Sequence, residues 1–98
     1  LKAAGVVPVA FGNAAGWPAF HTFSAFANNM VSPERLQAMI AGTESWDSPE
    51  VTAAIQAAFV DLQEKGCYNP SVNAVSYDDA NALFMAGQAG MTLTGSWM

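Results

Sequence analysis

Three serine-led signals in this chain each mark the start of a helix. Ser32-Pro33-Glu34 and Ser48-Pro49-Glu50 both combine an N-cap serine, a proline suited to the first helical turn and a carboxylate near the positive end of the helix dipole. Ser76-Tyr77-Asp78-Asp79 has the pattern of a capping box. The apolar residues from Val51 to Leu62 recur at helical spacing, so the second signal is predicted to open a helix of about four turns.

Two short apolar segments, one before and one after these helices, are predicted to be β-strands. The run from Val6 to Phe11 is continuous and rich in β-branched residues, and Pro8 favours an edge position for it. In Met91-Thr92-Leu93-Thr94 the alternation predicts a strand whose Met91 and Leu93 side chains face a core. Because two strands alone rarely make a stable sheet, we expect further strands outside this chain.

The predicted order of elements is strand, four helices, strand, which indicates a predominantly helical α/β fold. The first helix begins at Trp17-Pro18 and ends near Asn28-Asn29. Of the 98 residues 52% are hydrophobic and only 11% are charged, against roughly 25% charged in typical soluble domains. A chain of this length buries a modest core, so much apolar surface is left over. We therefore interpret residues 1–98 as a single partial domain, or as a chain that associates with copies of itself.

Charge and motif content exclude several classes of function. The net charge of −5, with three basic and eight acidic residues, disfavours nucleic acid and anionic membranes as partners. No apolar run approaches the length of a membrane span. Cys67 is the only cysteine, and no Cys/His cluster, EF-hand loop or phosphate-binding glycine loop is present. No metal or cofactor is predicted.

Catalysis is poorly supported by the residues. His21 is the only histidine, so a catalytic triad would have to combine it with a serine and an aspartate, and no nucleophile elbow is present. The adjacent Asp78 and Asp79 are better explained as carboxylates stabilised by a helix N-terminus than as an acid–base pair. We therefore predict a protein that is not an enzyme.

Two of the three tryptophans are candidates for ligand contact. Trp17 and Trp97 each follow glycine-containing turns rather than lying on the apolar stripe of a helix, and Gly95 is expected to let the backbone turn sharply before Trp97. A rigid indole face suits stacking on the C–H face of a sugar. The alternatives are that both rings fill the core or a subunit contact. Trp46 precedes a helix cap, where a hydrophobic staple is the simpler explanation.

Several segments, in this order along the chain, resemble extracellular solute-binding proteins of sugar-transporting ABC systems. They are Val7-Pro8-Val9-Ala10-Phe11-Gly12-Asn13 with Gly16-Trp17-Pro18, then Trp46-Asp47-Ser48-Pro49-Glu50, and finally Ser76-Tyr77-Asp78-Asp79-Ala80 with Met91-Thr92-Leu93-Thr94-Gly95-Ser96-Trp97. The closing Met-Thr-Leu-Thr-Gly-Ser-Trp is the most specific of them. The resemblance covers essentially the whole chain.

The resemblance implies a segment of one lobe of a two-lobed, periplasmic-binding-protein-like II fold that closes on a sugar and docks on a membrane permease. It implies that Trp97 stacks on the sugar, that Trp17 is a second cleft aromatic and that His21 could reach a hydroxyl. Asn13 is a further candidate for a hydrogen bond to ligand, although asparagine in a turn is also favoured for its backbone tolerance. One departure is Ala15, because many relatives carry an acidic residue at that place.

The leading hypothesis is therefore the substrate-recognition component of a carbohydrate ABC importer. Such a protein would bind a mono- or oligosaccharide by aromatic stacking and hydrogen bonds, would partner the permease subunits and would work outside the cytoplasm, in a periplasm or anchored by lipid at the cell surface. The alternative is a helical structural or self-association module with no ligand of its own.

Overall fold

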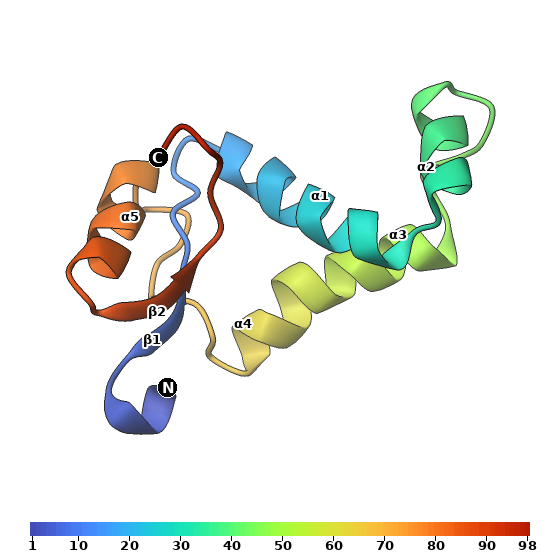
Figure 1. Ribbon diagram of the computed structural model, residues 1–98. Helices are drawn as coiled ribbons and strands as arrows, with labels where there is room; N and C mark the ends of the chain where they lie inside the picture. The colour runs from blue at the N-terminus through green and yellow to red at the C-terminus, as the bar shows by residue number, and fades with distance from the viewer.

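The protein is an elongated α/β structure, with a small sheet at one end and a helical hairpin at the other (Figure 1). The computed structural model describes all 98 residues and measures 44 × 28 × 20 Å. Its elements in chain order are η1 (Lys2–Ala4), β1 (Val7–Ala10), α1 (Trp17–Met30), α2 (Pro33–Ile40), α3 (Pro49–Ile55), η2 (Gln56–Asp61), α4 (Leu62–Glu64), α5 (Tyr77–Met85) and β2 (Ala89–Thr92). No helix has both the length and the apolar character needed to cross a membrane.

The three predicted helix starts are confirmed. The hydroxyl oxygens of Ser32, Ser48 and Ser76 each accept a hydrogen bond from the backbone N–H three residues later, at 3.3, 3.3 and 3.0 Å. Each cap satisfies one of the N–H groups that a helix N-terminus leaves unpaired. Helices α2, α3 and α5 therefore begin at residues 33, 49 and 77, as the sequence predicts.

The long helix predicted after Ser48 is present, but it is not α-helical throughout. Helices α3, η2 and α4 follow one another without a break, and η2 is a π-helix of six residues. The Tyr68 hydroxyl donates a hydrogen bond of 2.6 Å to the Ala58 carbonyl oxygen inside this π-helical segment. Because that contact comes from a loop ten residues away, the local apolar spacing could not reveal it.

The two predicted strands pair with each other in parallel, with Val7 opposite Ala89 and Val9 opposite Met91. The prediction that Met91 and Leu93 face a core is wrong, since they are 51% and 43% exposed. The two side chains line an apolar hollow of about 270 Å³ between the sheet and helix α1, which no side chain fills.

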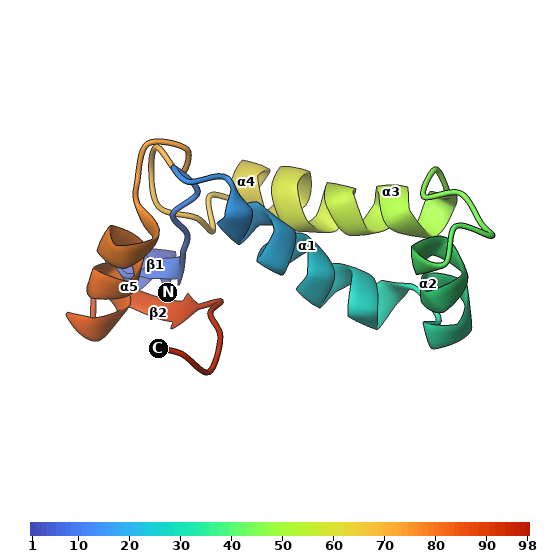
Figure 2. The same cartoon turned by 90° about the horizontal axis from the view of Figure 1, so that it is seen from above.

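Two small cores support the ends of the molecule. At the helical end, α1, α2 and α3 bury Ala27, Val31, Met39, Val51 and Ala54. At the sheet end Ala10, Ala80 and Ala89 are the buried residues, and α5 packs against both strands through them. Figure 2 shows α1 running alongside α3 and α4, with α2 at the far end from the sheet. Because the core of the sheet is built from alanine, α5 approaches the strands closely.

The end of strand β1 is held by two close contacts. Asn69, which is only 2% exposed, accepts a hydrogen bond of 2.6 Å from the Phe11 backbone N–H. The next residue, Gly12, lies directly against the Ser76 carbonyl at the start of α5, where any Cβ would overlap that oxygen. These contacts fix the position of the α5 N-terminus relative to β1.

We predict that Gly12→Ala lowers the free energy of unfolding by about 1–3 kcal/mol, because the new methyl group forces α5 away from β1. Urea denaturation followed by circular dichroism measures this change. Ser24→Ala, on an exposed position of α1, is the control and should stay within about 0.5 kcal/mol of the parent. Equal stability of the two variants would contradict the close contact at Gly12.

Candidate functional site

Aromatic side chains from separate segments of the chain meet beside the sheet. Trp17 and His21 come from the first turns of α1, Tyr77 is the first residue of α5, and Trp97 lies in the segment that follows β2. We call these four residues the aromatic cluster. Pro18 in the first turn of α1 and the Ser76 cap of α5 position the residues on these two helices. The pairing of β2 with β1 brings Trp97 beside them.

The rings of the aromatic cluster pack against one another at steep angles. Ring centroids are 4.7 Å apart for Trp17 and Tyr77, 5.1 Å for Trp17 and His21, 5.5 Å for His21 and Trp97, and 6.3 Å for Trp17 and Trp97. The interplanar angles of 51–83° include the edge-to-face arrangement that aromatic quadrupoles favour. The rings therefore fill the space between them, and a ligand can reach only their outward surfaces.

Those outward surfaces are open to solvent. Trp97 is 59% exposed and Trp17 is 38% exposed, so neither indole fills the core. This rules out the alternative in which both rings are buried plugs. Contact with a ligand and contact with another protein surface remain as explanations for two exposed indoles.

Hydrogen bonds connect the aromatic cluster to the strand segment that follows β2. The Trp97 indole Nε1–H donates to the Tyr77 hydroxyl oxygen at 2.8 Å, and the Tyr77 hydroxyl also bonds to the Thr94 hydroxyl. One turn further along α5, Asn81 Oδ1 accepts from the Thr92 hydroxyl at 3.3 Å. The segment that carries Trp97 is thus attached to α5 by side chains.

A turn begins at Gly95, as the sequence predicts, and is closed by the hydrogen bond from Met98 N–H to the Gly95 carbonyl oxygen at 3.3 Å. Gly95 also has a second role. Its backbone does not adopt a positive φ, whereas a Cβ at this position would overlap the six-membered ring of Trp97. The indole therefore lies back against the Gly95 backbone. Glycine leaves the space that the ring occupies, and any larger residue here would require the indole to move.

Three of the four residues proposed from the sequence come together in the aromatic cluster, namely Trp17, His21 and Trp97. The ring neighbours of His21 are the two indoles, and its side chain forms no hydrogen bond with a serine or an aspartate. The geometry of a catalytic triad is therefore not found at His21. No group of histidine, cysteine and acidic residues suitable for a metal ion is present either.

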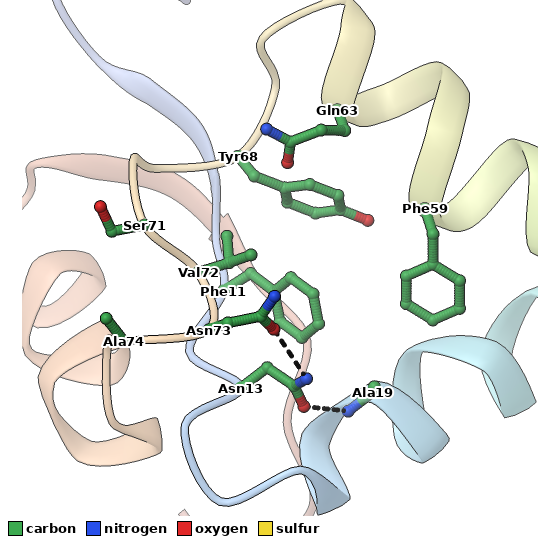
Figure 3. Close-up of a pocket in the computed structure, with 10 residues that line it drawn as sticks. All are labelled: Phe11, Asn13, Ala19, Phe59, Gln63, Tyr68, Ser71, Val72, Asn73 and Ala74. Atoms are coloured by element: carbon green, nitrogen blue, oxygen red, sulfur yellow. Dashed lines mark hydrogen bonds between the residues drawn. The ribbon is translucent and has the colours of Figure 1, made fainter.

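Asn13 lies apart from the aromatic cluster, and its side chain is engaged within the chain. Its Oδ1 accepts from the Ala19 backbone N–H at 2.9 Å, and its Nδ2 donates to Asn73 Oδ1 at 3.2 Å (Figure 3). Asn13 thus supports the start of α1 and ties it to the loop before α5. A ligand contact of Asn13 stays a prediction from the sequence.

Asn13 also borders a hollow of about 580 Å³ that shares no residue with the aromatic cluster. Figure 3 shows the side chains around it, which are Phe11, Asn13, Ala19, Phe59, Gln63, Tyr68, Ser71, Val72, Asn73 and Ala74. None of them is charged.

Tyr77 is the member of the aromatic cluster that the sequence did not single out. In the sequence it reads as part of the helix-start signal after Ser76, and that local role is correct. The sequence does contain one indication that Tyr77 could be a site residue. The first residue of a capped helix is held in place by the cap, and its side chain stays near the surface. Its contacts with Trp17 and Trp97 depend on three distant segments and could not be read from spacing.

The two tyrosines have opposite electrostatic environments. The hydrogen bond with the Thr94 hydroxyl lowers the pKa of Tyr77 below the ordinary value of 10.0. Burial raises the pKa of Tyr68 to about 12, and the neighbouring Cys67 adds to the rise. Tyr68 therefore stays neutral at pH values where Tyr77 ionises.

We predict that a titration of tyrosine absorbance at 295 nm resolves two steps, with Tyr77 ionising below pH 10 and Tyr68 near pH 12. Tyr77→Phe should remove the lower step and Tyr68→Phe the upper one. Because the pKa of Tyr68 is higher in the folded chain than in the unfolded chain, its contribution to stability is present below about pH 10 and is lost as the pH rises through 12. A single titration step at the ordinary tyrosine pKa of 10.0 would contradict both pKa shifts.

Comparison with known proteins gives relatives of one kind. No protein-family model matches the sequence. The chain is 33% identical over 97 residues to an uncharacterised ABC transporter extracellular-binding protein of Pyrococcus horikoshii, covering 99% of this chain and 21% of that protein. The chain thus spans about a fifth of the length of this curated relative.

Two solved structures share the fold of the whole chain. A chitin oligosaccharide binding protein aligns with a TM-score of 0.88 and 31% identity, over 98% of this chain and 24% of its own. A structure from work on xylan utilization by the thermophilic bacterium Caldanaerobius polysaccharolyticus aligns with a TM-score of 0.89 and 26% identity, over 96% of this chain and 24% of its own. The α/β fold predicted for part of one lobe is confirmed. The chain is therefore similar in sequence to a segment of an extracellular-binding protein of an ABC transporter, and it shares its fold with a segment of a chitin oligosaccharide binding protein.

Proposed function

We propose that this chain supplies the aromatic part of a carbohydrate-binding site in the substrate-binding protein of an ABC importer. The observation that carries the proposal is the aromatic cluster, in which two exposed indoles lie beside a histidine and a tyrosine at one edge of the molecule. An indole face offers an apolar surface with a negative quadrupole, which suits the C–H face of a pyranose ring. The imidazole of His21 adds a polar group that can bond a sugar hydroxyl.

The charge pattern supports a neutral ligand. No lysine or arginine belongs to the aromatic cluster, and the chain as a whole carries a net charge of −5, so an anionic ligand would find no counter-charge here. A small cation held in an aromatic cage is disfavoured as well. The rings occupy the space between them, which leaves no enclosed volume for a cation to sit among several faces.

Within the carbohydrates we favour an oligosaccharide over a single sugar. The names of the solved relatives, one a chitin oligosaccharide binding protein and one from work on xylan utilization, support this choice.

The role of the whole protein follows from the same proposal. The Pyrococcus relative is described as an extracellular-binding protein of an ABC transporter, which supports a location outside the cytoplasm and a membrane permease as the partner. Binding and delivery of a sugar require no chemical step. The proposed protein is accordingly not an enzyme.

We predict that Trp97→Ala weakens oligosaccharide binding by about 1–3 kcal/mol, because a large exposed indole face is removed from the contact. Isothermal titration of the intact binding protein with chitin and xylan tetrasaccharides measures the change. Trp46→Ala is the matched control, since Trp46 is similarly exposed at 43% and lies outside the aromatic cluster. Unchanged affinity in Trp97→Ala would remove Trp97 from the site.

A second candidate, self-association through an apolar face, is favoured by one specific observation. Ala19, Phe20, Phe23, Ile55 and Phe59 line a wholly apolar hollow of about 310 Å³ between α1 and the following helices. Phe20 at its rim is 73% exposed. Apolar surfaces of this kind usually lie at contacts between proteins.

For the isolated 98-residue chain we predict association that rises with concentration in light scattering. Phe20→Ser should reduce it, because the substitution removes a large exposed apolar side chain from this face and puts a polar group in its place, whereas Trp97→Ala should leave it unchanged. A monomeric parent chain at every concentration would argue against this second candidate.

A further inference from the structure

The orientation of Trp97 depends on side chains rather than on regular secondary structure. Strand β2 ends at Thr92, and the segment from Leu93 onward has no helix or strand. The backbone around the indole has only the hydrogen bond from Met98 N–H to the Gly95 carbonyl, at 3.3 Å. A loop held this weakly samples many side-chain directions unless other groups restrain it.

Besides its packing against the rings of Trp17 and His21, the indole has two further restraints. Gly95 leaves the space into which the ring folds back, and the Tyr77 hydroxyl accepts the Nε1–H bond at 2.8 Å. Of these, only the bond to Tyr77 is directional, so it selects one rotation of the ring. The Thr94 hydroxyl bonds to the same Tyr77 oxygen and holds the loop backbone beside it.

Tyr77 is itself well fixed. It occupies the first position of α5, directly after the Ser76 cap, and its ring lies 4.7 Å from that of Trp17. Gly12 holds the same helix start against the end of β1. The tyrosine therefore connects a rigid helix end to both indoles of the aromatic cluster.

We propose that Tyr77 is a positioning residue that holds the Trp97 indole by its N–H edge, so that Trp97 offers its ring face, and not its N–H group, to the ligand. This inference rests on the proposed carbohydrate function and deepens it. Because the single indole donor is already bonded to Tyr77, recognition at Trp97 depends on C–H contact with a sugar face. Hydrogen bonds to sugar hydroxyls must then come from other groups, such as His21.

The test is Tyr77→Phe, which deletes the hydroxyl and keeps the ring beside Trp17. Tyr68→Phe is the matched control, since it also removes one tyrosine hydroxyl, in this case the donor to the Ala58 carbonyl oxygen, but at a residue outside the aromatic cluster. Two quantities are measured on the intact binding protein. One is the indole ¹H–¹⁵N resonance of Trp97, assigned by its loss in Trp97→Phe, and the other is the affinity for a chitin tetrasaccharide by calorimetry.

In Tyr77→Phe the Trp97 indole resonance should shift upfield and the affinity should fall about two- to tenfold, as for the loss of one hydrogen bond. In Tyr68→Phe the Trp97 indole resonance and the affinity should both match those of the parent protein. An unshifted indole resonance in Tyr77→Phe would overturn the positioning role whatever the ligand. A shifted resonance with unchanged affinity, while Trp97→Ala does lose binding, would also overturn it.

Failure of the proposed function has a different signature. If the parent binds neither chitin nor xylan tetrasaccharide, the carbohydrate assignment fails. The indole resonance then still decides whether Tyr77 holds Trp97, because that measurement needs no ligand.

Discussion

The parallel pairing of β1 with β2 is the constraint on which the rest of the structure depends. Two parallel strands end at the same edge of a sheet, and in open α/β folds ligands bind outside that edge. Here the turn that leads to Trp17 leaves the end of β1, and the segment that carries Trp97 leaves the end of β2. Residues 80 positions apart in the chain are brought to ring contact by this register, in which Ala10 lies opposite Thr92.

A two-stranded sheet is only marginally stable by itself, so the pairing of β1 with β2 needs support from a helix packed on the sheet. Helix α5 provides that support by packing on the strands through buried alanines. Because Gly12 has no side chain, the start of α5 can contact the end of β1. The Asn69 side chain satisfies the buried Phe11 N–H, which has no strand partner. Small residues and one buried amide therefore determine how close Tyr77 comes to the two indoles.

The parts of the fold that follow from local chemistry could be predicted from the sequence. Serine caps at Ser32, Ser48 and Ser76 act on N–H groups three residues away, so their pattern is visible in the chain itself. The places of Trp17 and Trp97 beside glycine-containing turns make them candidates for contact in the sequence, but only the structure shows that both rings are exposed.

What could not be predicted depends on contacts between distant segments. Within the π-helical η2 the Ala58 carbonyl oxygen accepts a hydrogen bond from Tyr68, and Met91 borders an apolar hollow beside α1. The hydrogen bonds of the Asn13 side chain with Ala19 and Asn73 join separate segments, so the sequence alone does not predict them. Tyr77 is not singled out by the sequence, because its place in the helix-start signal after Ser76 already accounts for a tyrosine there.

We expect the outward faces of Trp17 and Trp97 to receive a carbohydrate. The most direct measurement is the intrinsic fluorescence of the intact binding protein as an oligosaccharide is added, with Trp46 and every other tryptophan outside the aromatic cluster replaced by phenylalanine. We predict a saturable change in emission that follows the calorimetric binding curve, because both remaining indoles exchange water for sugar. Calorimetric binding without any change in emission would contradict it.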